Sequence, residues 1–451
     1  MRSDQQQAIN RLAGTSATAF LCAVLCVYPL YIDKFSNLGV TKFTGCFTLF
    51  LLFLLWLVAC TAIGARAPRP RNANAGRDVT LWGVLAFAGT SLISTFTSLS
   101  PTASTWGLGG YYGGLMLVLF TAAGYWAVRS YLDLENLDFV FWVLGITTSI
   151  VAVLYVLNIF NIDLIGAYAD TAVVERAQFF STLGQKDFNG CFFSVALPIV
   201  FYQFLNAKDT RTAVWTGIPA AFGALALAVV DSEALALGIG AAVMVLVCHK
   251  NFTTRHLRRA ALISAAFFGW AAWMHYMRAS VYTQGGTALL AKLGAWQVAL
   301  PCMAASLLLW LVLFVLARKG IAAQAPLYLP GRVITIAVLA VGALAFVLAN
   351  AMPNLPLPES LHNLLVFNDD WGTYRGVAWR AAFGTWADGS LLRKIVGIGP
   401  GMMHTAVAAW AGDAMTARMA TFYAAHNEYL EQLLTTGILG LAAWPLLVAA
   451  H

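Results

Sequence analysis

The sequence predicts an all-α, multi-pass membrane protein, and three observations lead to that fold class. Hydrophobic residues make up 60% of the 451-residue chain and charged residues 10%, whereas soluble domains average about a quarter charged. Apolar stretches of about 17–25 residues recur, the length that a helix needs to cross a hydrocarbon core of roughly 30 Å. Most of the lysines and arginines lie at the N-terminus and in every second loop between these stretches, that is, on one side of the predicted membrane.

Twelve apolar stretches are interpreted as transmembrane helices. In chain order they cover residues 14–32, 43–65, 79–96, 114–128, 139–161, 190–206, 213–230, 234–248, 260–277, 293–317, 333–352 and 437–450. The first follows Arg2 and Arg11 without a small-residue cleavage site, so we expect a span rather than a removable signal. The last has about fourteen residues before the chain stops at His451, and we interpret it as truncated because a span needs about 20.

These stretches divide the chain into three parts. Residues 1–352 form a bundle of eleven spans, residues 353–436 form a large extracytoplasmic loop, and residues 437–451 form the final span. The basic residues set this orientation. The N-terminus and the loops 66–78, 129–138, 207–212, 249–259 and 318–332 hold 16 of the 27 lysines and arginines, the short outer loops hold six, and the long loop holds five. The positive-inside rule places the first group in the cytoplasm, beside anionic lipid, so we expect no nucleic-acid partner.

Cysteine and glycine patterns predict neither a disulfide framework nor a cofactor. All seven cysteines lie in or at the edges of apolar runs, where they are typical packing residues. No Walker or dinucleotide fingerprint is present. The glutamates after His426 do not follow the HExxH spacing, and no second histidine lies one turn away, so no metal is expected.

The long outer loop concentrates the residues that can carry chemistry. Four cations lie within twenty positions, with one tryptophan just before them and two between them: Arg375, Arg380, Arg393, Lys394, Trp371, Trp379 and Trp386. A guanidinium group can bind a phosphate through two parallel hydrogen bonds, and tryptophan side chains are common at membrane interfaces. The alternative is that the arginines anchor lipid headgroups. The run GIGPG, with Gly397, Gly399 and Gly401, can present backbone N–H groups to an anion, or it can be an ordinary turn.

His426 is the candidate proton acceptor. Continuing the final helix backward places His426, Leu430, Leu433 and Gly437 on one stripe, with the ring about two to three turns above the apolar segment. A neutral imidazole at that position can take a proton from a hydroxyl group. The alternative is a histidine that caps or bridges the start of the helix.

Three segments resemble the bacterial O-antigen ligase and O-antigen polymerase family. His426 and Asn427, followed after nine residues by Gly437-x-x-Gly440, resemble the family's signature. Upstream, Arg375, Trp379 and GIGPG are similar to its "R…W…GxGxG" pattern. ERAQFFSTLGQKDFNGCFF, with Arg176 and Asn189, is similar to its "R…tfgnpN" segment.

This resemblance implies an inverting, metal-independent glycosyltransferase of the GT-C type in the bacterial cytoplasmic (inner) membrane, with an extracytoplasmic active site. Its donor would be an undecaprenyl-pyrophosphate-linked glycan, and its acceptor a hydroxyl on a glycan, lipid or protein. Arg176 and Arg375 would hold the pyrophosphate, and His426 would position or deprotonate the acceptor. The basic cluster adds Arg380, and the motifs add Asn189, Asn427, Gly397, Gly399 and Gly401 as substrate-binding residues.

Other functions stay open at this point. Within the family, the chain could be a ligase, a polymerase or a protein O-oligosaccharyltransferase. A lipid-linked glycan transporter or flippase is the main alternative outside it, although transporters usually carry ionisable residues near the middle of their spans, and these spans carry few. An inert membrane scaffold would not need arginines and a histidine gathered in one outer loop.

Overall fold

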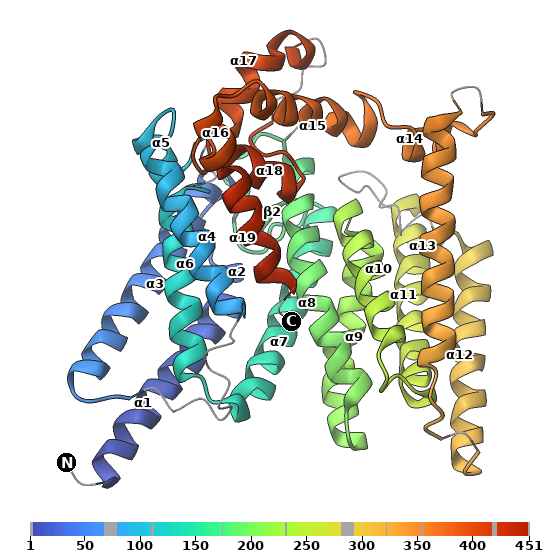
Figure 1. Cartoon of the computed structure of the whole chain (residues 1–451). Helices are drawn as coiled ribbons and strands as arrows, with labels where there is room; N and C mark the ends of the chain where they lie inside the picture. The colour runs from blue at the N-terminus through green and yellow to red at the C-terminus, as the bar shows by residue number, and fades with distance from the viewer. Residues whose placement is uncertain are drawn as a thin grey trace. The chain divides into compact units, whose positions relative to one another are not determined.

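The computed structural model describes residues 3–66, 79–108, 110, 112–173, 175–230, 232–280, 293–321, 323–352, 355–416 and 422–449. Across these residues the regular structure is helical, apart from one two-stranded hairpin (Figure 1). Among them, eight segments are long and apolar enough to cross a membrane: Asp4–Leu30, Phe35–Ala62, Val79–Phe96, Leu134–Ile159, Lys186–Asn206, Thr210–Val229, Trp296–Arg318 and Tyr328–Ala351. The chain is an all-α, multi-pass membrane protein, as its composition predicts.

Each of the twelve predicted stretches falls on a helix, but four of these helices are shorter or less apolar than the other eight. They are α6 (Leu115–Tyr131), α10 (Glu233–Cys248), α11 (Thr254–Ser280) and α19 (Gly437–Ala449). The count of twelve crossings and the side of the membrane on which each loop lies therefore stay predictions.

The chain divides into two compact units that each combine distant segments. The first unit contains Met1–Ala17, Cys46–Leu132 and Ala340–His451, and the second contains Thr18–Gly45 and Asp133–Leu339. Three helices cross the division: α1 (Ser3–Cys22), α3 (Leu38–Ala62) and α13 (Tyr328–Ala351). The predicted division at residue 352 follows the polarity of the chain, whereas these units follow its contacts.

In the first unit, α4 (Val79–Phe96) packs against α6 and α19. The segment predicted as an outer loop is largely folded into short helices, and Figure 1 shows α15 to α18 gathered beyond one end of α4 and α6. These helices are α14 (Glu359–Leu365), α15 (Trp371–Ala387), α16 (Leu391–Val396), α17 (Met403–Thr416) and α18 (Glu428–Thr435).

Side-chain caps begin several of the short helices. Ser100 accepts a hydrogen bond from the backbone N–H of Ala103 and begins α5 (Pro101–Trp106), with proline at the first helical position. Ser390 accepts from the N–H of Arg393 and begins α16. These caps satisfy N–H groups that the helix itself cannot pair, typically stabilising its first turn by about 1 kcal/mol.

The second unit is a helix bundle around α7 (Leu137–Ile159), α8 (Lys186–Asn206) and α9 (Thr210–Val229), with α10 packed on α8 and α11 on α9. Its core includes the fully buried Tyr155, Phe193 and Leu197. It also contains α12 (Trp296–Arg318), the short α2 (Tyr28–Leu30) and the antiparallel strands β1 (Phe179–Phe180) and β2 (Gly184–Gln185).

Candidate functional site

Three motif segments that lie far apart in the sequence pack together in the first unit. Residues of α15, of the GIGPG turn and α17, and of the segment that carries His426 share one buried cluster: Val377, Ala378, Ala381, Ala382, Ile398, Met402, Met403, Ala406, Val407, Ala411, Phe422, Ala425 and Leu434. Six of these are alanines, so the backbones approach closely. The cluster joins the predicted arginine, glycine and histidine motifs into one folded site.

Ala425 immediately precedes His426, and both its carbonyl oxygen and its N–H form hydrogen bonds with side chains. The indole Nε1 of Trp379 on α15 donates to the carbonyl oxygen of Ala425 at 2.9 Å. The carboxylate Oε2 of Glu431 on α18 accepts from the backbone N–H of Ala425 at 2.7 Å. Ala425 is fully buried, so both bonds are shielded from competing water. We call this arrangement the Ala425 clamp.

His426 lies just outside the helix that it was predicted to join. Helix α18 begins at Glu428, and His426 has a left-handed backbone with φ of 50°. Its side chain is exposed, and its ring meets Phe422 edge-on with 5.8 Å between centroids. The expected stripe from His426 to Gly437 is therefore wrong, because the helical path is also interrupted at Thr436 before α19 begins.

Asn427 takes the capping role that sequence analysis considered for His426. Its side-chain oxygen accepts from the backbone N–H groups of Tyr429 at 3.1 Å and Leu430 at 3.4 Å. This N-cap satisfies two of the helix's orphan donors and fixes where α18 begins. Asn427 therefore has a structural role at the start of α18, and its contact with substrate stays a prediction.

The two predicted arginines of α15 have different surroundings. Arg375 is half-buried and lies one helical turn before Trp379, so the two residues share a face of α15. Arg380 is largely exposed and forms an ion pair with Asp369. A guanidinium already paired with a carboxylate has less positive charge to offer a phosphate, so this ion pair weakens the case for Arg380 as an anion ligand.

The GIGPG turn joins α16 to the elements around it. The N–H of Gly397 donates to the carbonyl of Arg393 at 2.8 Å, and the N–H of Gly399 donates to the carbonyl of Thr435 at 2.9 Å and to Ser94 Oγ at 3.0 Å. These two amides are therefore engaged within the protein and do not form the expected anion cradle. Gly401 differs, since it lines a cavity beside α18.

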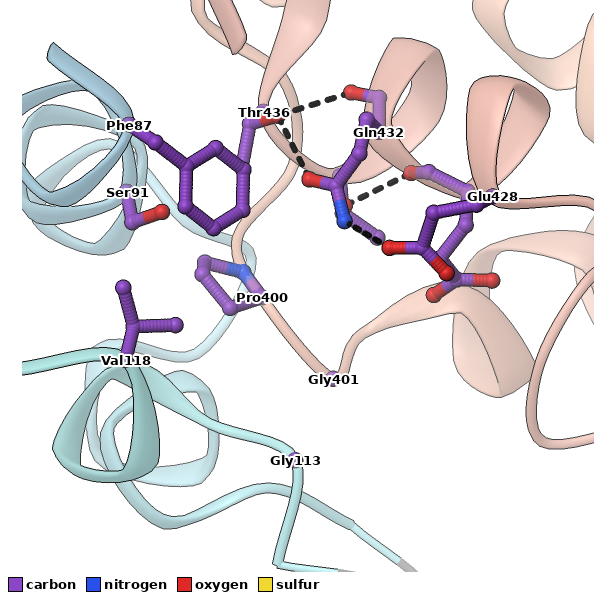
Figure 2. Close-up of a pocket in the computed structure, with 11 residues that line it drawn as sticks. Phe87, Ser91, Gly113, Val118, Pro400, Gly401, Glu428, Gln432 and Thr436 are labelled. Atoms are coloured by element: carbon purple, nitrogen blue, oxygen red, sulfur yellow. Dashed lines mark hydrogen bonds between the residues drawn. The ribbon is translucent and has the colours of Figure 1, made fainter. Parts of the chain in front are cut away.

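That cavity, of about 160 Å³, is bounded by α4, the start of α6, the GIGPG turn and α18. Figure 2 shows Phe87 and Ser91 of α4 on one side and Glu428 and Gln432 of α18 on the other. Gln432 Nε2 donates to Glu428 Oε1 at 2.6 Å, and Thr436 Oγ1 donates to Gln432 Oε1 at 3.0 Å. This polar network continues to the joint between α18 and α19.

Glu431 also lines the cavity, and its carboxyl is electrostatically unusual. Burial penalises its charged form and raises its pKa to about 7; the negative Glu428 adds to this rise, while the hydrogen bond from Ala425 opposes it. A carboxyl that changes protonation state near neutral pH is typical of functional sites. It can donate as well as accept a hydrogen bond.

Sequence reasoning did not select Glu428, Glu431 or Gln432 as site residues. Their spacing of three and four residues places them on one face of a helix, and this was the signal that could have found them. The partner wall from α4 could not be found in this way, because it lies more than three hundred residues earlier in the chain.

The second unit contains the other two predicted site residues. Arg176 is half-buried, its Nε donates to the carbonyl of Thr171 at 3.4 Å, and its guanidinium lies 5.4 Å from the ring centroid of Tyr168. Asn189 is fully buried. Its amide nitrogen donates to the carbonyls of Phe180, Gly184 and Gln185, and its oxygen accepts from Ser181 Oγ at 2.6 Å.

Asn189 has a structural role, because its polar groups hold the β1–β2 hairpin onto α8, and its contact with substrate stays a prediction. The role of Arg176 in holding the pyrophosphate stays a prediction.

Among the described residues, no three His, Cys, Asp or Glu side chains are grouped so that they could hold a metal ion. No protein-family model matches the chain, and no curated protein or solved structure matches it.

Proposed function

We propose that this protein is a membrane glycosyltransferase that passes a glycan from undecaprenyl pyrophosphate to an acceptor hydroxyl on the outer face of a bacterial cytoplasmic membrane. The observation that carries the proposal is the Ala425 clamp. It connects the arginine motif on α15 to His426 through Trp379, although 46 positions separate the two bonded residues. The packing of the resembling motifs into one cluster supports their common role.

In the proposed reaction, the acceptor oxygen attacks the anomeric carbon of the donor sugar. The new glycosidic C–O bond forms as the bond to the pyrophosphate oxygen breaks, and this displacement inverts the configuration. His426 takes the proton from the acceptor hydroxyl, a contribution typically worth about 10²–10⁴ in rate. The electron pair of the broken bond leaves with the pyrophosphate, whose growing negative charge Arg375 stabilises.

The surroundings of His426 fit this role. Its ring is exposed while the preceding residue is buried and held by two hydrogen bonds. A proton acceptor must reach its substrate yet keep a fixed position. The acceptor is a glycan, lipid or protein hydroxyl, so ligase, polymerase and protein O-oligosaccharyltransferase activities share this proposed site.

The direct test is glycan transfer in vesicles that contain the purified protein, an undecaprenyl-pyrophosphate glycan and candidate acceptors. We expect His426→Ala and Arg375→Ala each to reduce transfer at least about a hundredfold. The matched control is His362→Ala, on α14, which should keep the wild-type rate. Transfer that persists in both site variants at normal protein abundance would reject the assignment.

The Arg375→Lys variant tests how the phosphate is held. We expect it to rescue transfer poorly, because an ammonium group cannot form the paired hydrogen bonds of a guanidinium. A lysine variant with wild-type transfer rates would count against phosphate binding at this position.

A further inference from the structure

The cavity beside α18 has the composition of a binding site for an uncharged polar ring. Its walls combine two carboxyls and an amide with apolar surfaces from Phe87, Val118 and Pro400. Among the described residues that line it there is no lysine, arginine or histidine. A pyrophosphate would meet negative charge here, so the cavity suits a different part of the substrate.

Ser91 provides an independent sign that a ligand is accommodated. Ser91 is fully buried, and its hydroxyl has no hydrogen-bond partner among the residues that the structure describes. Buried polar groups are normally paired, and an unpaired one costs about 1–3 kcal/mol. Figure 2 shows this side chain on the cavity wall opposite Glu428 and Gln432, where a ligand hydroxyl would complete its bonding.

The size and chemistry of the cavity point to one sugar ring. An apolar cavity of about 150 Å³ holds a benzene ring, so the observed volume of about 160 Å³ suits a single six-membered ring. Carboxylates accept hydrogen bonds from sugar hydroxyls, and Gln432 can both donate and accept. The Phe87 ring and Pro400 offer an apolar surface for the C–H face of the sugar.

We propose that this cavity is a pyranose subsite, in which Ser91, Glu428 and Gln432 hydrogen-bond the hydroxyls of one uncharged sugar ring. The inference rests on the proposed function for its physiological role, since that function supplies a glycan as the substrate. It extends that function by separating the sugar-binding wall on α18 from the basic residues on α15. Glu431, which is partly protonated near neutral pH, can hydrogen-bond a ring hydroxyl in either direction.

The test measures the binding of methyl pyranosides to purified protein in lipid nanodiscs by saturation-transfer NMR. The probes are methyl glucoside, methyl galactoside and methyl N-acetylglucosaminide, with methyl glucuronide as the anionic comparison. We expect at least one neutral probe to bind at millimolar concentration and the glucuronide to bind at least about tenfold more weakly, because its carboxylate faces Glu428. No binding of any neutral probe, or equal binding of the glucuronide, would overturn the proposal.

Two variants then locate the binding. Ser91→Leu removes the hydroxyl and fills the cavity, and Glu428→Gln keeps an oxygen for Gln432 but loses the charge. Both should weaken binding of the neutral probe about tenfold, whereas Glu359→Gln, a matched exposed glutamate on α14, should bind like wild type. Unchanged affinity in Glu428→Gln and Ser91→Leu would overturn the subsite, and the Glu428 variant decides the question if the leucine variant does not fold.

This binding assay needs neither donor lipid nor transfer. His426→Ala should bind the neutral probe with wild-type affinity, so the two proposals fail separately. Sugar binding that depends on Ser91 and Glu428 without any transfer would leave the subsite standing and remove the proposed function. Transfer that depends on His426 but not on Ser91 or Glu428 would leave the proposed function standing and remove the subsite.

Discussion

His426 has a left-handed backbone conformation that costs a residue with a side chain about 1–2 kcal/mol. Such a conformation persists where neighbouring interactions fix it. The Ala425 clamp lies on one side of this residue, and the Asn427 cap lies on the other. Because both flanking residues are held, the ring is presented to solvent from a fixed backbone.

Glu431 makes stability depend on pH. Its pKa is raised from 4.5 to about 7 in the folded chain, so the stability that protonation contributes is fully present below about pH 4.5 and is lost as pH rises to about 7. This loss amounts to about 3 kcal/mol, since each tenfold change in proton affinity corresponds to about 1.4 kcal/mol.

We therefore expect the unfolding temperature of the wild type in detergent to fall between about pH 4.5 and about pH 7. Glu431→Gln keeps an oxygen for the Ala425 N–H but cannot ionise, so its unfolding temperature should change less over this range. Glu359→Gln is the control and should follow the wild type. An equal pH dependence in Glu431→Gln and the wild type would show that this carboxyl is not the titrating group.

The roles of single residues were only partly predictable from the sequence. The motif drew attention to His426 and Arg375, because their chemistry depends on residue type. Asn189 and Asn427 were predicted to bind substrate, yet their amide groups bond the backbone of the protein. Asparagine serves both purposes equally well, and its neighbours in the folded chain decide which applies.

At the scale of the elements, the GIGPG turn and the α18–α19 joint fit closely together. Gly397 and Gly437 both have left-handed backbones, with φ of 81° and 69°. A Cβ atom added at Gly397 would lie 2.2 Å from the carbonyl oxygen of Thr435, and one at Gly437 would lie 2.3 Å from that of Ile395. These glycines allow the end of α16 to contact the break between α18 and α19.

Gly397→Ala should therefore lower the free energy of unfolding by about 2 kcal/mol or more, through both backbone strain and the clash with Thr435. The matched control is Gly89→Ala on α4, where an added Cβ meets nothing within 4 Å and helix propensity improves. Thermal unfolding of the two variants side by side checks this expectation. A Gly397→Ala protein as stable as the Gly89→Ala protein would contradict the described fit.

Hydropathy predicted the long helices better than the short ones. The predicted span 79–96 coincides with α4, because a run of apolar residues is sufficient to specify a membrane helix. Helices α14 to α18 were predicted together as an outer loop. Each has only 6 to 17 residues, and helices this short depend on tertiary packing that the sequence does not display.

At the scale of the whole molecule, the orientation in the membrane remains a prediction from the basic residues. Replacing the native cysteines and introducing single cysteines tests it. Leu391→Cys lies on α16 and should react with a membrane-impermeant maleimide added to intact spheroplasts, whereas Lys319→Cys, after α12, should react only after lysis. Both positions are exposed in the structure. The reversed labelling pattern would place the candidate site on the cytoplasmic face.

The most direct test of the proposed function is the rate of glycan transfer by His426→Asn in the same vesicles as the wild type. Asparagine accepts a left-handed backbone more readily than most residues, so this variant removes the imidazole while keeping the conformation between the Ala425 clamp and the Asn427 cap. We expect an unchanged unfolding temperature and a transfer rate lower by about 10²–10⁴. A wild-type rate in this variant would contradict a catalytic role for the ring.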